Sequence, residues 1–432
     1  MNFSDSEIVA SVMTSQGFDI TEKQEEADII FINTCSIREH AENRVINRLR
    51  ELQHLRKNKP GLKLGVLGCM AERMKASLLE DEELGMRIDM VAGPDAYRQL
   101  PGLLDDIEGG QQAINVMLLA DETYADISPV RYAAGGVSAF VSIMRGCENY
   151  CAYCVVPYTR GKERSREPGS IIDELRQLAE AGYREVTLLG QNVNSYKWRD
   201  NGSGNLVGFS DLISMAAEVD PGIRIRFATS HPRDISEELL HKMAEYPNIC
   251  RAIHLPVQSG SNAILKKMNR KYTRESYLKK IEAIKRILPG CAISTDIIAG
   301  FCSETEMDHK QTISLMEEAG FDFSFMFKYS ERPGTAAAKK FRDDVPEHEK
   351  TRRLNEIIQK QQEISLASNK KDIGKTFEVL VEGSSRRSKD NSMGRTSQNK
   401  VVVFPSVNFS TGEYVKVRID SCTSATLKGK VV

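Results

Sequence analysis

The sequence lacks long apolar segments, a large excess of charge of either sign and an export signal. No apolar run reaches the ~18 residues that a membrane-spanning helix needs, so we expect no such helix and no membrane partner. The formal net charge is −1, which excludes a chain that coats nucleic acid with an overall basic surface. The N-terminus has no basic stretch followed by an apolar one, so it is not a secretory signal peptide.

The missing export signal places the nine cysteines in a reducing cytoplasm, where disulfides rarely form. We therefore expect them to bind metal, to take part in chemistry or to pack as small apolar side chains. Hydrophobic residues make up 41% and charged residues 28% of the 432 residues, as in soluble globular proteins with two or three domains. The chain has no internal repeat and no low-complexity segment.

The first 115 residues alternate between short apolar runs and helix-like stretches, at 27–35, 40–58, 62–69, 71–80, 89–93 and 95–108. This alternation predicts a doubly wound parallel sheet with helices on both faces. Ligands of such sheets bind at the carboxyl ends of the strands. Cys35 and Cys69 end the first two predicted strands, so both are expected at that edge of the sheet.

A larger α/β region follows a poorly patterned connection at 111–137. Its strand candidates lie at 139–144, 185–190, 223–229, 251–256, 292–300 and 321–330, with helical patterns between them. Because eight such units are needed to close a barrel, six predict an open or partial one. After a polar helix at about 346–370, short runs rich in β-branched residues predict a small all-β barrel from about 371.

Three cysteines lie within the segment RGCENYCAYC, directly after the first predicted barrel strand. The C-x3-C-x2-C spacing of Cys147, Cys151 and Cys154 lets one loop wrap a metal centre. A [4Fe–4S] cube has four irons, so three thiolates leave one iron open for S-adenosylmethionine (SAM). Structural zinc is the alternative, but zinc sites usually take two cysteine pairs and the chain has no second C-x2-C.

The other cysteines, and the tyrosine inside the triplet, admit two interpretations each. Cys35 and Cys69 are metal ligands at one sheet edge or buried thiols, which are common in protein cores. Tyr153 packs on the cofactor or in the core. The isolated cysteines on or beside predicted strands are expected to be core thiols: Cys250, Cys291, Cys302 and Cys422.

Segments along the whole chain resemble the radical SAM methylthiotransferase family. They are NTCSIREHAE (33–42), LGCMAER (67–73), RGCENYCAYCVVPYTRG (145–161), ERSREP (163–168), TSHP (229–232), LPVQSGS (255–261) and SERPGTAA (330–337). The most similar branch is that of the tRNA 2-methylthio-N6-isopentenyladenosine synthases. The resemblance implies a flavodoxin-like N-terminal domain over residues 1–115, a radical SAM (β/α)6 partial barrel over 133–365 and a TRAM domain over 366–432.

The resemblance also implies an auxiliary [4Fe–4S] cluster held by three cysteines of the N-terminal domain. Cys35 and Cys69 match the second and third of them. The first normally lies in a Gly-Cys-Gln-Met-Asn segment, whereas this sequence opens at Met1-Asn2. Either the chain is truncated or the auxiliary cluster has an unusual ligand. We favour truncation and expect an N-terminal domain that is short of one strand, with a sheet edge or core face exposed.

Basic residues near the cysteine triplet and in the tail suggest contacts with RNA phosphates. Arg160, Arg164 and Arg166 follow the triplet in one loop, which suits the phosphates of an anticodon loop. The tail has few acids among its basic residues Lys370, Lys371, Lys375, Arg386, Arg387, Lys389, Arg395 and Lys400. The alternative for both groups is that these side chains only face solvent and bind no RNA.

Polar residues at or near the ends of the predicted barrel strands are candidates for SAM and substrate contacts. The candidates for SAM are Tyr153, Gln191, Asn192, Ser230, Gln258 and Asp296, and Arg332 is a further candidate for substrate. A role in stabilising the local loop is the alternative for each, as it is for His231, which precedes a proline and is placed to cap a turn.

In the reaction that the resemblance implies, one SAM gives a methyl group to a sulfur on the auxiliary cluster. A second SAM, at the triplet cluster, gives a 5′-deoxyadenosyl radical that removes hydrogen from C2 of N6-isopentenyladenosine at position 37 of tRNA. The implied partners are the anticodon stem-loop and an electron donor such as flavodoxin or ferredoxin, with a monomeric, cytoplasmic enzyme. The alternatives are threonylcarbamoyladenosine in tRNA, an aspartate of a ribosomal protein, or a non-catalytic RNA-binding protein with structural metal.

Overall fold

The computed structural model describes residues 1–34, 39–75, 77–80, 86–131, 136–200, 202, 204–385, 388–406 and 409–432, apart from the side chains of 39–41 and 389. The chain forms two compact units. Unit 1 comprises Met1–Ala134, Met144–Tyr150 and Cys154–Ser170, and unit 2 comprises Gly135–Ile143, Cys151–Tyr153 and Ile171–Val432. Residues 144–150 and 154–170, which the sequence analysis placed in the central domain, thus group with unit 1. No helix of the described residues is long and apolar enough to cross a membrane.

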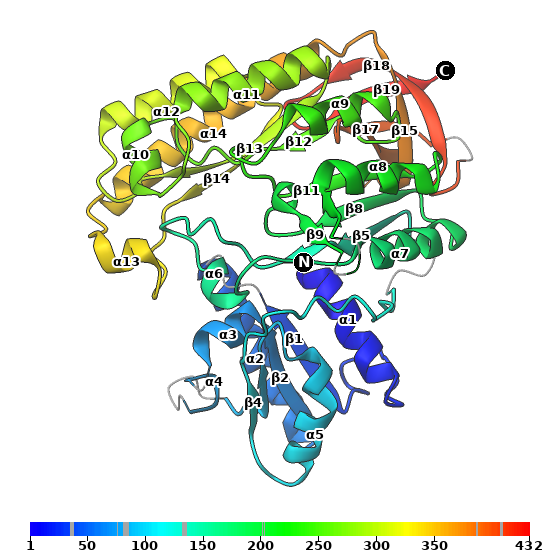
Figure 1. Ribbon diagram of the computed structural model, residues 1–432, viewed down its shortest axis with the longest axis vertical. Coiled ribbons are helices and arrows are strands. Elements are labelled where there is room, and N and C mark those ends of the chain that lie inside the picture. Colours follow the sequence, from blue (N-terminus) through cyan, green and yellow to red (C-terminus); the bar gives the residue numbers. More distant parts are fainter. Residues whose placement is uncertain are drawn as a thin grey trace. The chain divides into compact units, whose positions relative to one another are not determined.

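Unit 1 contains a parallel four-stranded sheet, seen in the lower part of Figure 1. Its strands follow the chain in the order β1 (Ile29–Thr34), β2 (Lys63–Gly68), β3 (Met90–Ala92) and β4 (Ala113–Asn115). Strand β1 forms one edge, and its first five residues are only half-buried, whereas β2 is buried after its first residue. Strand β4 corrects the sequence analysis, which took 111–137 as a connection. Its three residues are too few for an alternation of apolar and polar residues to predict a strand.

Helices cover both faces of this sheet, as predicted. Apolar residues of β2 alternate between two cores: Leu67 packs with α1 (Asn2–Thr14) and α5 (Leu100–Glu108), and Val66 packs with α2 (Glu39–Asn58) and α3 (Cys69–Met74). This alternation follows from the period of two along a strand. The short helices α4 (Ser77–Glu80) and η2 (Tyr97–Gln99) complete the two helical layers, and β6 (Met144–Arg145), α6 (Val156–Thr159) and β7 (Arg164–Ser165) also belong to unit 1.

Unit 2 contains the predicted partial barrel of six parallel strands. They are β5 (Ser138–Ser142), β8 (Glu185–Leu189), β11 (Arg224–Ala228), β12 (Ala252–His254), β13 (Ala292–Ala299) and β14 (Phe323–Lys328). They form two three-stranded sheets, β11-β8-β5 and β12-β13-β14, and a parallel bridge from Ile225 to Ile249 links the first sheet to the segment before β12. All strands run the same way, so their carboxyl ends lie along one rim.

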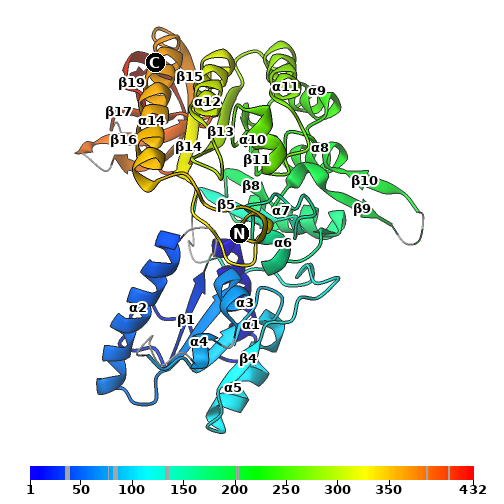
Figure 2. The same cartoon turned by 90° about the vertical axis from the view of Figure 1, so that its left-hand side faces the viewer.

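The helices of unit 2 lie between and after the barrel strands, and the last of them matches the polar helix predicted at about 346–370. They are α7 (Pro168–Glu180), η3 (Val193–Ser195), α8 (Phe209–Val219), α9 (Glu237–Glu245), α10 (Asn262–Lys267), α11 (Arg274–Ile287), α12 (Glu306–Ala319), α13 (Ala336–Lys340) and α14 (Glu347–Lys370). Helix α14 packs along β14 (Figure 2). A hairpin of β9 (Lys197–Arg199) and β10 (Leu206–Gly208), which the sequence did not predict, projects beside α7 and α8 in the same view.

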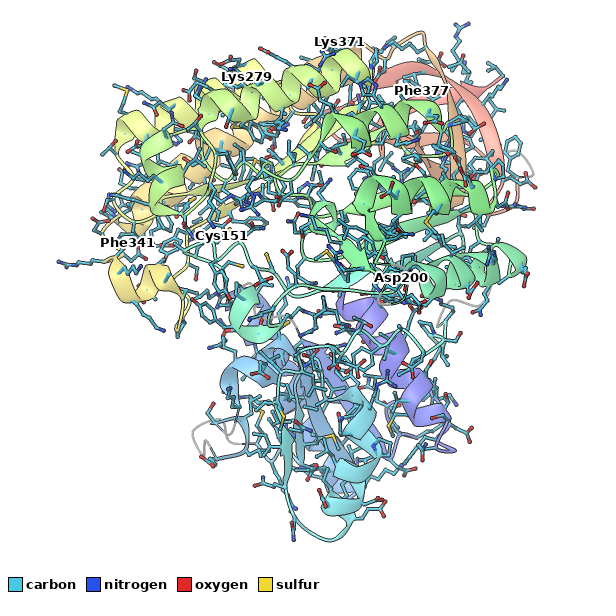
Figure 3. The ribbon with its side chains drawn as sticks, in the orientation of Figure 1. Cys151, Asp200, Lys279, Phe341, Lys371 and Phe377 are labelled. Atoms are coloured by element: carbon cyan, nitrogen blue, oxygen red, sulfur yellow. The ribbon has the colours of Figure 1, made fainter. Side chains whose placement is uncertain are left out.

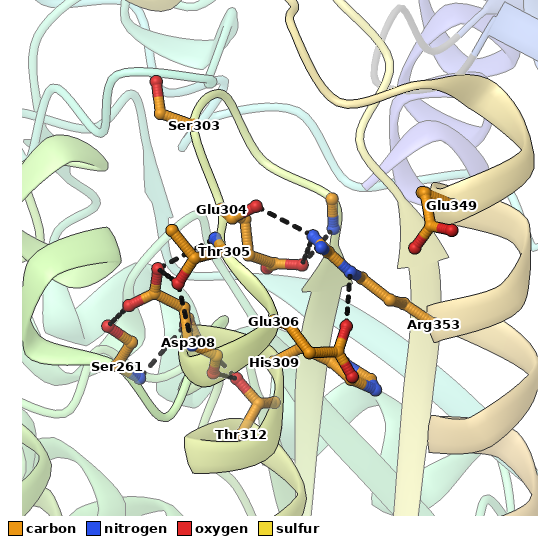
Figure 4. Close-up of polar contacts among 12 residues, drawn as sticks. Ser261, Ser303, Glu304, Thr305, Glu306, Asp308, His309, Thr312, Glu349 and Arg353 are labelled. Atoms are coloured by element: carbon orange, nitrogen blue, oxygen red, sulfur yellow. Dashed lines mark hydrogen bonds and ion pairs between the residues drawn. The ribbon is translucent and has the colours of Figure 1, made fainter.

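A polar network fixes the starts of α10 and α12, which follow the barrel strands β12 and β13 (Figure 4). Asp308 caps α12 together with Thr305 and accepts a hydrogen bond from Ser261 Oγ, the N-cap of α10, at 2.5 Å. Arg353 of α14 donates to the Glu304 carboxylate at 3.0 Å and to its carbonyl at 2.9 Å. Helices α10, α12 and α14 are therefore tied together by hydrogen bonds between their side chains and the loops that precede them.

The tail of unit 2 is a closed five-stranded barrel, as predicted. Its strands are β15 (Thr376–Ser385), β16 (Ser388–Thr396), β17 (Val401–Pro405), β18 (Tyr414–Cys422) and β19 (Leu427–Val431), in the order β15-β16-β17-β19-β18. Two arginines of β11 attach it to the partial barrel. Arg224 donates to Arg395 O at 2.8 Å and Glu378 O at 3.0 Å, and Arg226 donates to Thr396 O at 2.8 Å and Ser397 O at 3.0 Å.

Candidate functional site

The cysteine triplet lies in the loop between β6 and α6. Cys147 and Cys154 belong to unit 1, and Cys151, which is labelled in Figure 3, belongs to unit 2. None of the eight described cysteines forms a disulfide. Among the described residues, no group of three His, Cys, Asp or Glu side chains is close enough to hold a single metal ion. An iron–sulfur cube does not need such a group, because each thiolate binds a different iron.

A glycine sets the path of the chain into the triplet. Gly146 has φ +80°, and a Cβ at this position would lie 1.8 Å from Lys162 O. The Cys147 N–H then reaches Gly161 O at 3.2 Å, next to the antiparallel pairing of β6 with β7. Asn149 Nδ2 lies 3.6 Å from Cys147 Sγ and donates to it. The loop is thus closed at its base by backbone contacts that tolerate only glycine.

The middle of the triplet is anchored in unit 2. The Ala152 N–H donates to Met268 O at 2.8 Å, and the Ala152 carbonyl accepts from the Ala337 N–H at 2.7 Å. Cys151 is buried, and its sulfur accepts a hydrogen bond from Arg270 Nη1 at 3.1 Å. Tyr153 is half-buried against an apolar cluster that includes Phe301. This packing fits the core interpretation of Tyr153, and its contact with a cofactor stays a prediction.

Unit 1 contains a buried network of charged residues beside Cys69. Asp5 accepts hydrogen bonds from Arg145 at 2.5 Å and from Arg160 at 2.6 Å, and Arg160 Nε also donates to Cys69 Sγ at 3.2 Å. Burial alone would raise the pKa of Asp5, but the two guanidinium groups outweigh it and lower that pKa. Asp5 is therefore a carboxylate that holds two arginines in place.

Arg160, Arg164 and Arg166 were predicted to contact tRNA phosphates, but their side chains are buried in unit 1. All three are buried, at 3%, 7% and 6% exposure. Arg164 donates to Asp95 Oδ1 at 3.0 Å and Leu119 O at 2.6 Å. Arg166 donates to the hydroxyl and the carbonyl of Ser170, at 2.9 and 3.0 Å. These contacts direct the guanidinium groups into unit 1, so a structural role replaces the phosphate contact in our interpretation.

Cys69 occupies the predicted carboxyl end of β2 and is the first residue of α3. The chain turns there at Gly68, with φ +87°. One turn later, Glu72 is buried, and this burial raises the pKa of its carboxyl to about 7. Cys35, the other predicted ligand at this edge, lies outside the described residues, as do Ser36, Ile37 and Arg38.

The predicted SAM residues follow strands of the partial barrel. Gln191 comes after β8, Ser230 after β11 and Gln258 after β12, and Asp296 lies within β13. Thr229 and Gln258 have φ of +74° and +69°, a strained backbone conformation that is common at functional loops. Arg332, the substrate candidate that follows β14, is buried at 6% exposure.

Two of these loops contain polar atoms that lack hydrogen-bond partners within the described part of the chain. These atoms are Gln191 Oε1, Ser230 Oγ and both amide atoms of Asn194. A buried polar atom is rarely left unsatisfied, so the group points to a ligand or water. Asn194 was not predicted, because an asparagine inside a loop has no sequence signal that separates it from ordinary turn residues.

Asn192 and His231 stabilise their own loops. Asn192 donates to Asp234 at 2.7 Å and accepts the His231 N–H at 3.0 Å. The imidazole of His231 accepts the Arg233 N–H at 3.2 Å, as in a capped turn. Burial, helped by the charge of Arg270, lowers the pKa of His231 to about 2, so the ring is neutral at physiological pH.

Two further residues at the rim escaped the sequence analysis. His254, at the end of β12, lies 3.4 Å from Asp296 Oδ1 and hydrogen-bonds to Ser294 Oγ at 3.0 Å. Arg270, after α10, contacts Cys151. Neither lies in a motif with fixed spacing to the cysteines, so only the tertiary structure identifies them.

Some of the tail residues that were predicted to contact RNA phosphates form ion pairs with acids of the chain. Lys375 and Lys400 pair with Asp372 at 3.0 and 2.7 Å, and Arg395 pairs with Glu382 at 3.1 Å. Lys370 and Lys371 are exposed. Arg386, Arg387 and the side chain of Lys389 lie outside the described residues.

Three family models match the chain. They are the radical SAM superfamily over residues 141–316, the uncharacterized protein family UPF0004 over 1–93 and the TRAM domain over 370–432. Among solved structures, the fold is similar to that of the radical S-adenosylmethionine methyltransferase TsrM from Kitasatospora setae. The TM-score is 0.55 at 14% identity, over 78% of this chain and 72% of TsrM, which shows a shared fold only.

Curated relatives match the whole chain. A tRNA-2-methylthio-N(6)-dimethylallyladenosine synthase of Amoebophilus asiaticus is 56% identical over 441 residues, covering 100% of this chain and 90% of the relative. The protein of that name from Bacteroides thetaiotaomicron is 56% identical over 432 residues, covering 100% and 94%. The motifs, the three matched families and these relatives agree, and the chain belongs to the tRNA-2-methylthio-N(6)-dimethylallyladenosine synthase family of radical SAM proteins.

Proposed function

We propose that this protein methylthiolates C2 of N6-isopentenyladenosine (dimethylallyladenosine) at position 37 of tRNA, next to the anticodon, with SAM as methyl donor and radical source. The observation that carries the proposal is the 56% identity over the whole chain to synthases of that name. The domains are assigned as residues 1–115, 133–365 and 366–432. The enzyme is a cytoplasmic monomer that takes electrons from a donor such as flavodoxin or ferredoxin.

The first cluster is assigned to Cys147, Cys151 and Cys154, whose spacing leaves one iron of a [4Fe–4S] cube for SAM. When bound, this cluster supplies the electron for reductive cleavage of SAM. The residues present fit such a group, because none of the three thiols is in a disulfide and two of the sulfurs accept hydrogen bonds, from Asn149 and Arg270. Hydrogen bonds to the ligand sulfurs are a common feature of iron–sulfur sites.

SAM is assigned to the rim of the partial barrel. Gln191, Asn194 and Ser230 offer the buried polar atoms that lack partners in the described residues. Asp296 and Gln258 border the same rim, and Tyr153 of the cluster loop is assigned to SAM with them. Asn192 and His231 hold these loops in shape. Arg332 is assigned to the substrate, since it follows the last strand of the barrel.

A second [4Fe–4S] cluster is assigned to unit 1, with Cys69 and Cys35 among its ligands. Cys69 lies at the carboxyl end of β2, where parallel sheets bind ligands. Its sulfur accepts the Arg160 Nε hydrogen bond, and Asp5 holds that arginine in place. A fixed guanidinium group therefore lies beside the sulfur that is assigned to iron.

The tail barrel grips RNA phosphates through the outer face of β18 and β19. Arg418 and Lys430 lie directly opposite each other on these strands, and both are exposed. Lys416 and Lys428 extend the same face, while Asp420 is the only acid in the two strands. Like charges that face each other across strands destabilise a sheet. A row of phosphates would relieve this repulsion, so we name Lys416, Arg418, Lys428 and Lys430 the basic stripe.

The test is nucleoside mass spectrometry of tRNA from a strain that lacks the gene. We expect 2-methylthio-N6-isopentenyladenosine to disappear while N6-isopentenyladenosine accumulates, and the wild-type gene, but not Cys151→Ala, to restore the product. Loss of the methylthio group from threonylcarbamoyladenosine, or from a ribosomal-protein aspartate, would assign an alternative substrate. Unchanged modification of all three would reject the proposal.

A further inference from the structure

Arg270 is a buried cation with three hydrogen-bond acceptors. Its side chain donates from Nε to the Tyr272 hydroxyl at 2.8 Å, from Nη2 to Pro256 O at 2.8 Å and from Nη1 to Cys151 Sγ at 3.1 Å. The residue is 8% exposed. The guanidinium carbon also lies 5.1 Å from the centre of the Tyr272 ring. Its position and orientation are therefore fixed on several sides.

The charge of Arg270 is not balanced by a carboxylate. Other buried arginines pair with acids: Arg145 and Arg160 with Asp5, Arg164 with Asp95 and Arg353 with Glu304. Arg270 forms no ion pair with any Asp or Glu of the described residues. A buried cation without a counter-ion costs several kcal/mol. Tyr272 does not supply one, because its hydroxyl donates its proton to a neighbouring carbonyl. The Cys151 sulfur is the remaining contact able to carry negative charge.

The backbone holds Arg270 beside Cys151. Helix α10 ends in a Schellman motif, in which Asn269 is left-handed at φ +57° and its N–H donates to Lys266 O at 3.1 Å. The Arg270 N–H then donates to Leu265 O at 2.9 Å. The Ala152 N–H bonds to Met268 O at 2.8 Å, which ties the cysteine loop to the same turn. Guanidinium and sulfur therefore come from two backbones that are joined directly.

We propose that Arg270 raises the reduction potential of the iron–sulfur cluster that Cys151 binds, by donating a hydrogen bond to the ligand sulfur. The inference rests on the cluster assigned under the proposed function. On reduction, the cluster accepts one electron from an external low-potential reductant, its net charge becomes more negative by one and no bond of the chain breaks. A fixed cation favours the more negative state, and hydrogen bonds to the sulfurs and net charge are known to set such potentials.

The test is a redox titration of the full-length protein, reconstituted anaerobically with iron and sulfide and followed by electron paramagnetic resonance without SAM. At the same applied potential, we expect the ratio of reduced to oxidised cluster to be about tenfold lower in Arg270→Met than in wild type, a shift of ~59 mV for one electron. Arg270→Lys retains the charge and should lie between them. Lys271→Met is the matched control, because this neighbouring lysine is exposed and its charge is screened by water.

A second measurement uses wild-type protein, so it does not depend on whether Arg270→Met binds iron. In wild type labelled with 15N in the arginine guanidinium groups, the reduced cluster should show a 15N hyperfine coupling. The inference is overturned if this coupling is absent, or if Arg270→Met binds iron as wild type does and has the same potential. A wild-type protein without a cluster, or Cys151→Ala with normal SAM cleavage, would instead reject the proposed function.

Discussion

Gly146 precedes the first cysteine of the triplet and occupies a position that no other residue fits. Its φ of +80° costs an L-residue roughly 1–2 kcal/mol. The larger penalty is steric, because an added Cβ would lie 1.8 Å from Lys162 O. We expect Gly146→Ala to displace the loop from its base and to lose most of the iron of the first cluster. Iron analysis after anaerobic reconstitution measures this.

Gly290→Ala is the matched control at the residue scale. Gly290 has φ +77°, but an added Cβ would meet no atom within 4 Å. This variant carries the backbone strain without the clash, so it should lose about 1 kcal/mol of stability and keep its iron. Full iron binding by Gly146→Ala would show that the loop adjusts and that the steric argument is wrong.

At the scale of elements, strands β18 and β19 place exposed cations on one face of the tail barrel. Replacing Arg418 and Lys430 together by glutamine removes two charges that face each other. If both contact phosphates, the slope of log affinity for tRNA against log salt should flatten by about 1.5. Titrations of binding at several salt concentrations measure this slope, and the fold should be unaffected because both side chains are exposed.

The control for the strand variant is a helix variant with the same change of charge. Lys279 of α11 and Lys310 of α12 are exposed lysines of unit 2 outside the basic stripe. Replacing both by glutamine should leave the salt slope as it is in wild type. Equal slopes for the strand variant and wild type would contradict RNA binding through β18 and β19.

At the scale of the molecule, the tail barrel is joined to the partial barrel by buried arginines. Arg224 and Arg226 donate four hydrogen bonds to backbone carbonyls of the tail. At 0.5–1.5 kcal/mol each, these bonds contribute roughly 2–6 kcal/mol. We therefore expect removal of residues 371–432 to lower the unfolding temperature of the remaining protein, as calorimetry would measure.

Because these arginines join the two barrels, deletion of the tail is not a clean test of RNA binding. Deleting the tail changes both the stability of unit 2 and any phosphate contacts, whereas the double glutamine variant at Arg418 and Lys430 changes only surface charge. The double variant should therefore unfold at the wild-type temperature or slightly above it, because it also removes a pair of like charges that face each other. An unchanged unfolding temperature after removal of 371–432 would show that the arginine contacts do not stabilise the partial barrel.

The sequence by itself determined the six barrel strands, helix α14 and the cysteine loop, but not β4 or the hairpin of β9 and β10. The six barrel strands and α14 followed from apolar periodicity, which is a local property of neighbouring residues. The triplet followed from spacing, since Cys147, Cys151 and Cys154 share one short loop. Motifs along the chain also identified the family correctly, because they retain both residue type and order.

The tertiary structure alone decided which charges are buried and which face solvent. Arg160 and Arg164 belong to a basic loop in the sequence, yet the fold buries them against Asp5 and Asp95. Arg270 meets Cys151 across 119 positions of sequence. In the sequence, an arginine that the fold buries looks the same as one that faces solvent. Its role depends on partners that are distant in the chain, and only the packing of the helices and strands brings those partners within hydrogen-bond distance.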